Sequence, residues 1–378
     1  METSANSTVP DGQNIPTHFL FQWHVTERCN LRCRHCYQES AIAEELPYDA
    51  LTGILIQFAD FIALAGRIKS APIRAHITIT GGEPFIRPDF PDLLGRIAER
   101  RDLWTFAVLS NGTLIDKRTA TELAALGPRF VQVSIEGNQE THDRIRGPGS
   151  YRLAVRGIEQ LVSHRVPTTI SFTVSRDNMD QFGEVAKLAR SLGVQRLWAD
   201  RMIPVGGGAP NIDRTLSPQE TLDFFETMAK ERKRFTLAST EVAMHRALQF
   251  LAGQGTPYRC SAGYSLVTVL PDGGLVPCRR MPIPCGNILE QPLSQLYYSS
   301  PVFRSLRERD RIPVGCEKCF YSDVCNGGLK CLSAAIHSDP FVADPGCWLK
   351  GSEEAACQMR DTDACDVPDL PSTACGRF

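Results

Sequence analysis

The chain has 378 residues, and its 41 lysines and arginines against 43 aspartates and glutamates give a formal net charge of -2. This near-neutral balance excludes a protein that binds nucleic acid or an anionic membrane through bulk positive charge. With 42% hydrophobic and 22% charged residues the composition is ordinary for a globular protein, and the length suggests two or three domains of about 150 residues each. Fourteen cysteines are the unusual feature.

The use of these cysteines depends on the compartment. The first 18 residues are polar and lack the basic and apolar regions of an export signal. No segment has the roughly 18 uninterrupted apolar residues of a membrane span, since the most apolar stretch, residues 53–66, contains Gln57 and Asp60 and indicates a packed helix. We therefore predict a cytoplasmic protein with no membrane span, in which metal or cluster ligation is favoured over disulfides.

Strand and helix patterns alternate in the cysteine-free part of the chain. The expected strands are residues 19–26, 73–80, 104–109, 130–135, 168–174 and 196–203, and the expected helices are residues 48–70, 90–100, 117–126, 151–164 and 179–192. About six such units predict an α/β fold with a parallel sheet, and specifically a partial (β/α)6 TIM barrel, because a complete eight-unit barrel needs about 250 residues.

The domain plan follows from this pattern and from the cysteine spacing. After the barrel, three glycines at 206–208 break the alternation, and residues 218–251 suggest one or two connecting helices. The cysteine-rich part is rich in turns and short of helical periodicity. The predicted parts are a flexible tail (1–18), the barrel (19–215), a helical bridge (216–255), a cysteine-rich domain (256–350) and a tail (351–378) with Cys357, Cys365 and Cys375.

Three cysteines follow the first expected strand. Cys29, Cys33 and Cys36 have the spacing C-x3-C-x2-C, so that one loop can place three thiolates on one face of a 4Fe-4S cubane and leave the fourth iron without a protein ligand. The alternatives are a structural zinc knuckle and a four-cysteine electron-transfer cluster with a distant fourth ligand. Zinc sites favour paired C-x2-C units and four closed ligands, so the spacing favours the open cluster.

A second motif lies after the second expected strand. Gly81, Gly82, Glu83 and Pro84 form a Gly-Gly-Glu-Pro sequence, and together with the three-cysteine loop it resembles the radical S-adenosylmethionine (SAM) superfamily. The resemblance implies that this motif holds the methionine amino group of SAM, with glycines that leave room for the ligand and a glutamate that holds nearby donors in place. It also implies a reduced 4Fe-4S cluster that cleaves SAM to a 5'-deoxyadenosyl radical, which abstracts hydrogen from a substrate.

Later strand ends carry further candidate cofactor contacts. The segments 110–112 and 134–137 resemble motifs of the peptide-modifying branch of this superfamily. The additional cofactor-binding residues expected from the resemblance are Tyr37, Asn111, Ser134 and Arg146. Ser134 would contact the ribose and Arg146 would lie near the carboxylate of SAM; a strand-capping serine and a solvated arginine are the alternatives. Tyr37 either packs against adenine or plugs the barrel mouth.

The second cysteine field resembles the SPASM extension of the same superfamily, which holds auxiliary 4Fe-4S clusters. Cys260 and Cys278 have the spacing C-x12-G-x4-C, and the later cysteines begin with C-x2-C-x5-C. The resemblance assigns a distal closed site to Cys316, Cys319, Cys325 and Cys347, and a nearer site to Cys260, Cys278 and Cys331. Cys285 is an extra cysteine that either completes the nearer site or is a free thiol, so one or two auxiliary clusters are expected.

Enzymes of this kind act mostly on peptides, so the resemblance favours a ribosomally made peptide that undergoes a thioether, carbon-carbon, epimerisation or oxidation step. The alternatives are a tetrapyrrole-modifying enzyme of the haem pathway and, from another class, a zinc-binding scaffold. No protein side chain is assigned as catalytic, because the cofactor carries the radical chemistry. The expected partners are a separate leader-recognition protein and an electron donor of the flavodoxin or ferredoxin type, with no nucleic acid.

Two arginines follow the second cysteine of the extension. The sulfatase-maturing branch has a carboxylate base at this point, and Arg279 stands there instead, which counts against that branch. Arg279 and Arg280 either bind acidic groups, such as a peptide carboxylate or a porphyrin propionate, or are simple solvated charge.

Overall fold

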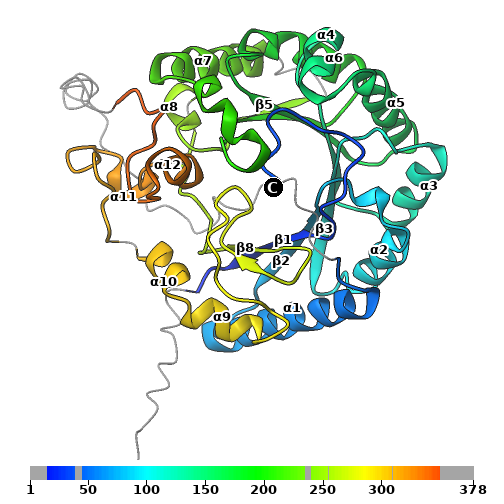
Figure 1. Cartoon of the computed structure of the whole chain (residues 1–378), viewed down its shortest axis with the longest axis vertical. Helices are drawn as coiled ribbons and strands as arrows, with labels where there is room; N and C mark the ends of the chain where they lie inside the picture. Colours follow the sequence, from blue (N-terminus) through cyan, green and yellow to red (C-terminus); the bar gives the residue numbers. More distant parts are fainter. Residues whose placement is uncertain (1–14, 39–44, 235–239, 254, 309, 350–378) are drawn as a thin grey trace, which may run out of the picture.

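The computed structural model describes residues 15–38, 45–234, 240–253, 255–308 and 310–349. Within them a single curved sheet has the strand order β7-β6-β5-β4-β3-β2-β1-β8-β9, and helices surround it (Figure 1). The strands are β1 His18–His24, β2 Arg74–Thr80, β3 Trp104–Ser110, β4 Phe130–Ser134, β5 Thr168–Val174, β6 Arg196–Arg201, β7 Glu241–Ala243, β8 Leu266–Val269 and β9 Leu275–Val276.

The helices that follow the barrel strands lie on the outside of the sheet (Figure 1). They are α1 Tyr48–Lys69, α2 Phe90–Ala98, α3 Lys117–Leu126, α4 Gln139–Arg146, α5 Ser150–Ser163, α6 Phe182–Ser191 and α7 Pro218–Arg234. The C-terminal half of the chain adds α8 Gln249–Gly253, α9 Leu293–Ser299, α10 Pro301–Arg307, α11 Ser322–Cys325 and α12 Lys330–His337. Figure 1 shows α9 to α12 along the side of the ring between α7 and α1, where the barrel is open.

The strands β1 to β6 pair in sequence order and all in parallel, which confirms the predicted partial (β/α)6 barrel. Strand β7 extends the sheet beside β6, and β8 pairs in parallel with β1. His24 of β1 lies opposite Thr80 of β2, so the two strands end at the same level. The loops after the strand ends therefore share one edge, which positions the site.

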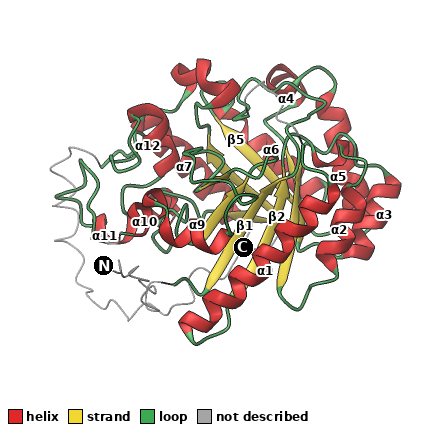
Figure 2. Cartoon of the chain, turned by 60° about the horizontal axis from the view of Figure 1, so that its bottom comes forward, coloured by secondary structure: helices red, strands yellow, loops and turns green. Residues whose placement is uncertain are grey.

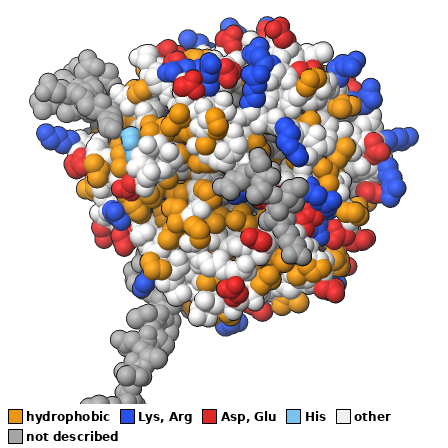
Figure 3. All heavy atoms as spheres, viewed as in Figure 1, with side chains coloured by type: hydrophobic (Ala, Val, Ile, Leu, Met, Phe, Trp, Pro, Cys, Tyr) orange, Lys and Arg blue, Asp and Glu red, His pale blue; other side chains and the backbone are white. Residues whose placement is uncertain are grey.

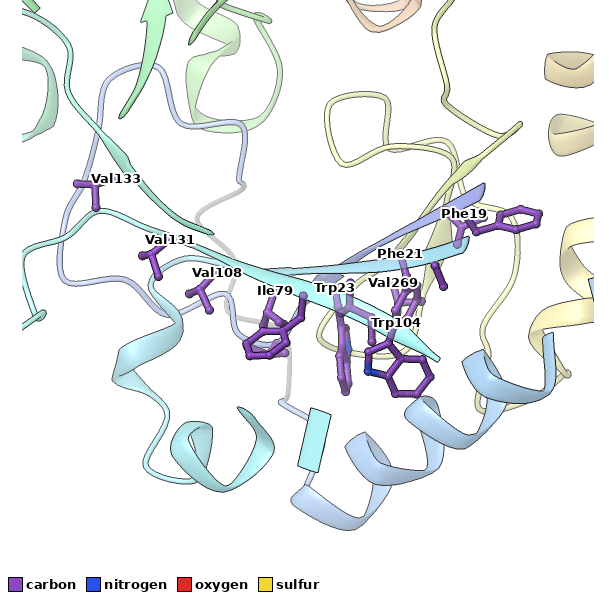
Figure 4. Packing of buried hydrophobic residues seen from close by; sticks show 14 of the residues in the cluster. Phe19, Phe21, Trp23, Ile79, Trp104, Val108, Val131, Val133 and Val269 are labelled. Atoms are coloured by element: carbon purple, nitrogen blue, oxygen red, sulfur yellow. The ribbon is translucent and has the colours of Figure 1, made fainter. Parts of the chain in front are cut away.

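Alternation along β1 separates the core from the barrel interior. Phe19, Phe21 and Trp23 are fully buried on the side that faces the helices, as Figure 4 shows. The Phe21 ring stacks on Phe58 of α1 with ring centroids 4.4 Å apart, and Figure 2 shows α1 along the outer side of β1 and β2. Gln22 instead lines a cavity inside the barrel, as the two-residue period of a strand requires.

Helix α1 contains the most apolar segment of the sequence, which was predicted to be a packed helix. Among the described helices it is the one that is long and apolar enough to cross a membrane by length and composition alone. Leu51, Phe58 and Phe61 are fully buried within the molecule, so the predicted packed helix is confirmed. On the face shown in Figure 3, charged side chains of both signs alternate around the rim, and hydrophobic side chains gather left of centre, over the C-terminal half.

Two expectations about the C-terminal half need correction. The expected helices in residues 218–251 are α7 and α8 with the strand β7 between them; a strand of three residues is too short to show a period of two. The cysteine-rich part contains four helices, α9 to α12, which were expected to be turns. Each has eight residues or fewer, about two helical turns, and that is too short for a clear 3.6-residue period.

Candidate active site at the strand ends of the barrel

A cavity of about 830 Å³ lies at the C-terminal ends of the barrel strands. Its walls come from the loop after β1, the ends of the following strands, and the cysteine-rich segment. Six cysteines line it: Cys29, Cys33, Cys36, Cys260, Cys278 and Cys331. The fold therefore brings the N-terminal cysteine loop and part of the C-terminal cysteine field to one space.

The loop that carries the first three cysteines is held by the Gly-Gly-Glu-Pro segment. The Gly82 and Glu83 N–H groups donate to the Thr26 and Arg28 carbonyls at 2.8 and 2.9 Å. A Cβ atom at Gly82 would lie 2.1 Å from the Arg28 carbonyl oxygen, and one at Gly81 would lie 2.4 Å from that of Thr26. Both glycines line the cavity, but their first physical role is the close backbone contact with the cysteine loop.

Glu83 lies behind this contact. Its buried carboxylate accepts hydrogen bonds from the Ser110 hydroxyl at 2.9 Å and the Asn111 N–H at 2.7 Å. Burial raises the pKa of Glu83 to about 7, against the effect of these donors. Pro84 begins a short 3-10 helix, η2 Pro84–Ile86, and is buried. Glu83 and Pro84 are not among the cavity-lining residues, so they position the ends of β2 and β3 around it.

Asn111 and Arg146 reach the cysteine loop from opposite sides. The Asn111 Nδ2 atom donates to Asn30 and lies 3.7 Å from the Cys29 Sγ atom. The Arg146 Nη1 atom lies 3.8 Å from the Cys33 Sγ atom, and its Nε atom donates to Glu136 at 3.0 Å. Arg146 is 9% exposed, so the alternative of a solvated arginine is wrong.

The first three thiols affect one another electrostatically. Burial raises the pKa of Cys33 to about 11; Arg146 opposes this, and the charges of Cys36 and Cys29 add to it. Burial likewise raises the pKa of Cys29. The Cys29 and Cys33 thiols would therefore stay protonated at pH 7 without a metal, and a metal cluster is what would hold them as thiolates.

The remaining expected cofactor contacts also line the cavity. The Ser134 hydroxyl lies 3.2 Å from that of Ser171. Burial raises the pKa of Tyr37 to about 12, and Cys36 and Cys278 are among the groups that act on it, so the phenol lies between the two sets of cysteines. Nothing in the structure tests the contacts of these two residues with SAM, which stay predictions.

The glycines at 206–208 have a role that the sequence reasoning missed. The Gly208 N–H donates to the Cys36 carbonyl at 2.7 Å, and the Gly207 N–H donates to the Gln38 carbonyl at 2.8 Å. A Cβ atom at Gly206 would lie 2.3 Å from the Tyr37 carbonyl oxygen. The signal was present in the sequence as three glycines after the last barrel strand, at the level of the other strand-end loops.

The cysteine-rich segment forms two groups of thiols. Cys260, Cys278 and Cys331 line the cavity. Burial raises the pKa of Cys331, and the charges of Cys278 and Cys260 add to this effect. The distal group lies outside the cavity: its members, whose pKa values respond to one another, are Cys316, Cys319, Cys325 and Cys347. This grouping is the same as the one that the resemblance to SPASM implied.

Cys285 is not brought to either group. Its buried side chain belongs to the main hydrophobic core, and its Sγ atom lies 3.4 Å from the Ile283 carbonyl oxygen. Burial raises the pKa of Cys285 to about 11, with an opposing hydrogen bond from Ser300 and no effect of another cysteine. Among the described residues no three Cys, His, Asp or Glu side chains converge tightly enough to hold a single metal ion.

Both arginines after Cys278 form ion pairs, and Arg279 is buried while Arg280 is partly buried. The Arg279 Nη2 atom lies 3.0 Å from the Glu27 carboxylate, and the Arg280 Nη1 atom lies 2.7 Å from that of Asp200. The alternative of solvated charge is therefore wrong for both. Arg280 connects the cysteine-rich segment to the end of β6, and Arg279 connects it to the loop that carries Cys29.

Comparisons with known proteins fit this geometry. Residues 23–189 match the model of the radical SAM superfamily, and residues 260–320 match that of an iron-sulfur cluster-binding domain, SPASM. The "AdoMet-dependent heme synthase" of Methanosarcina barkeri is 30% identical over 87% of this chain and 95% of its own length. The chain belongs to the radical SAM superfamily. It is thus an enzyme that uses a 4Fe-4S cluster and SAM, with a SPASM segment for auxiliary iron-sulfur clusters, and the zinc scaffold is excluded.

Two further similarities show the range within this superfamily. The "PqqA peptide cyclase" of Granulibacter bethesdensis is 25% identical over 86% of each chain. The crystal structure of Streptococcus suis SuiB bound to S-adenosylmethionine has a TM-score of 0.70 at 17% identity, and the match covers 89% of this chain and 78% of that one. The similarity to SuiB shows the fold. The two sequence relatives, the heme synthase and the peptide cyclase, differ in their named activities.

Proposed function

We propose that this radical SAM enzyme abstracts hydrogen from an anionic tetrapyrrole in haem formation. The observation that carries the proposal is the charge of the cavity wall: seven arginines line it against two acidic residues, Glu27 and Asp200. The lining arginines are Arg28, Arg32, Arg146, Arg201, Arg246, Arg279 and Arg280. A porphyrin with peripheral carboxylates complements this arginine-rich wall, although five of the seven arginines also pair with protein carboxylates, and the similarity to a heme synthase supports the same substrate class.

The chemistry of the wall around Trp198 suits a flat aromatic ligand. Trp198 of β6 lines the cavity, and the Arg246 guanidinium lies over its ring at 4.7 Å from the centroid. The Trp198 indole N–H donates to Gln132 at 2.9 Å, which fixes the plane of the ring. Aromatic and apolar side chains with a few placed polar groups are typical of cofactor-sized sites.

We assign the site residues as follows. Cys29, Cys33 and Cys36 would hold the first cluster, and SAM would occupy the space between them and the strand-end residues Gly81, Gly82, Asn111, Ser134 and Arg146. When bound, the reduced cluster and SAM supply one-electron hydrogen abstraction. The chain itself orients both ligands, keeps water out of the barrel, and holds the cysteine loop through the Gly82 and Gly208 N–H groups.

The auxiliary sites differ in what they can do. Cys260, Cys278 and Cys331 line the cavity, so a cluster there would be in reach of the substrate and could accept an electron from it. The distal four cysteines provide a closed site. We propose Cys285 as a free thiol, because it lies in the hydrophobic core away from both groups. The external electron donor of the flavodoxin or ferredoxin type stays a prediction.

A peptide substrate is the second candidate. The similarity to a named peptide cyclase supports it, and the arginine-rich wall would also suit an acidic peptide. A separate leader-recognition protein belongs to this second candidate and is not required by the first.

The test is a direct comparison of substrates. Anaerobically reconstituted enzyme, reduced with dithionite, is given SAM together with iron coproporphyrin III or with candidate peptides encoded next to the gene. We expect 5'-deoxyadenosine and a matching change in the mass of the porphyrin. Modification of a peptide, with no change in any porphyrin, would replace the first candidate by the second.

A further inference from the structure

Arg279 occupies the tip of a tight turn inside the cavity. Cys278 and Met281 pair across the turn, and the Met281 N–H donates to the Cys278 carbonyl at 2.9 Å. The two residues between them, Arg279 and Arg280, carry their side chains to different strand ends. Arg280 is held by Asp200 at the end of β6, so the turn is fixed from that side and Arg279 is presented towards the cysteine loop.

Arg279 has hydrogen-bonding capacity that the described protein does not use. Its side chain is 8% exposed and lines the cavity, and its Nη2 atom pairs with Glu27 at 3.0 Å. The Nε atom is buried and has no hydrogen-bond partner among the described residues. A buried N–H group of a charged side chain costs free energy when it has no hydrogen-bond acceptor. A ligand atom that accepts from Nε would remove this cost, which would favour binding of the ligand.

The surroundings of this donor favour an anion. Burial, with Arg279 beside it, holds the pKa of His24 well below its usual range, so the ring is neutral at pH 7. Glu27 balances the one positive charge of Arg279 through Nη2, and the Nε–H group on the other edge of the guanidinium is a charged donor that suits an anionic acceptor.

The position lies between the two sets of cavity thiols. Arg279 directly follows Cys278, and its charge acts on Tyr37, which directly follows Cys36. A group bound at the Nε atom would therefore place its parent molecule between the first cysteine loop and the nearer auxiliary group. This is where a substrate must lie to meet SAM on one side and an electron acceptor on the other.

We propose that the Nε–H group of Arg279 binds a carboxylate of the substrate and so selects substrates that carry one. The inference rests on the proposed function and narrows it to one contact. Arg279 acts in specificity and positioning: it holds the carboxylate so that a neighbouring carbon faces the SAM side of the cavity, and it takes no part in bond breaking.

The experiment compares one acid with its ester. Reconstituted enzyme with SAM is dialysed to equilibrium against iron coproporphyrin III or against its tetramethyl ester, and bound porphyrin is quantified after extraction. We expect Arg279→Gln to bind the acid roughly 10- to 100-fold more weakly than the wild type, with little change for the ester. Arg279→Lys should lie between, since lysine keeps the charge and loses the planar donor. Arg74→Gln, an exposed arginine at the start of β2, is the charge-matched control.

A second variant separates binding from structure. Glu27→Gln leaves the Arg279 guanidinium in place with less of its charge balanced, so it should bind the acid at least as tightly as the wild type. If the Glu27–Arg279 pair is merely structural, Glu27→Gln and Arg279→Gln will both weaken the binding of the acid and of the ester. That result would overturn the proposal. Equal iron content in all variants checks that the clusters are loaded.

The outcomes also separate this inference from the proposed function. If the wild type and Arg279→Gln bind the acid equally well, the tetrapyrrole function stands and the Arg279 contact is wrong. If the wild type binds neither porphyrin, the tetrapyrrole function and the contact both fail. Wild-type binding of the ester as tightly as the acid would show that no carboxylate is read.

Discussion

The two sets of thiols that meet in the cavity are built in opposite ways. Cys29, Cys33 and Cys36 come from one loop of eight residues, held by backbone hydrogen bonds to the Gly-Gly-Glu-Pro segment and to the glycines at 206–208. Cys260 and Cys331 are separated by 70 residues of sequence and meet because the C-terminal segment is fixed to the barrel by one buried and one partly buried ion pair. The first site is local and depends on close backbone packing; the second is non-local and depends on charge.

The largest effect is expected where the non-local site is anchored. Arg201 donates to both carboxylate oxygens of Asp344 at 2.7 and 2.6 Å, and both side chains are almost fully buried. Asp344→Asn leaves the Arg201 charge buried and unpaired, so we expect a loss of about 3 to 5 kcal/mol in the free energy of unfolding. Anaerobic urea denaturation measures it. The exposed pair Arg100–Asp102 provides the control, since solvent screens it and Asp102→Asn should leave stability nearly unchanged. Equal effects would contradict the anchoring role.

We expect the free energy of unfolding to depend on pH through Glu83, which lies behind the first cysteine loop. The folded-state pKa of about 7 lies above the usual value of 4.5, so the folded protein binds one more proton than the unfolded chain between these values. The stability that this proton provides is fully present below about pH 4.5 and is lost as the pH rises through 7. Relative to Glu83→Gln, the wild type should lose up to about 3 kcal/mol of unfolding free energy between about pH 5 and pH 8. Parallel curves for the two proteins would show that the pKa of Glu83 is not raised.

The backbone packing around the first cysteine loop can be tested by adding one methyl group at a glycine. Gly82→Ala places a Cβ atom against the Arg28 carbonyl, and backbone cannot give way as a flexible side chain does. We expect a loss of roughly 1 to 3 kcal/mol together with weaker retention of iron by the first cluster. Gly95→Ala in α2 is the matched control, because nothing lies within 4 Å of its added Cβ. If Gly82→Ala behaves like this control, in iron content and in unfolding, close packing is not what holds the loop.

The smallest effect is expected at Cys285. Cys285→Ser should leave the iron content unchanged, since the thiol lies in the core and apart from the other cysteines. Cys331→Ser should remove up to about four iron atoms per chain, the content of one 4Fe-4S cluster. Iron analysis after anaerobic reconstitution measures both. A loss of iron from Cys285→Ser would make this cysteine the fourth ligand of the nearer site.

The contrast between local and non-local sites also explains how much of the structure could be predicted from the sequence. The barrel strands and their helices followed from periodicity, and the three-cysteine loop followed from spacing, because each depends on residues that are neighbours in the chain. The grouping of the later cysteines was also predicted, through resemblance to SPASM. The separate location of Cys285 could not be predicted, because it depends on how β9 and α9 pack into the core.

Charge pairing was the other part that the sequence could not supply. Arg279 pairs with Glu27, and Arg201 pairs with Asp344; in each pair the two residues lie far apart in the sequence. An arginine in a turn gives no sign in the sequence that it is buried. The role of the glycines at 206–208 was missed for a related reason. Their contact with the loop of Cys36 exists only when the curved sheet brings the segment after β6 to the loop after β1.

The central claim is that Cys29, Cys33 and Cys36 form the site of SAM cleavage. The direct measurement is 5'-deoxyadenosine release from SAM by the reduced, reconstituted enzyme in which these three cysteines are replaced by alanine. The account predicts that release falls to the background without enzyme, while about four to eight iron atoms per chain remain on the auxiliary cysteines. Cleavage of SAM at the wild-type rate by this triple variant would contradict the account.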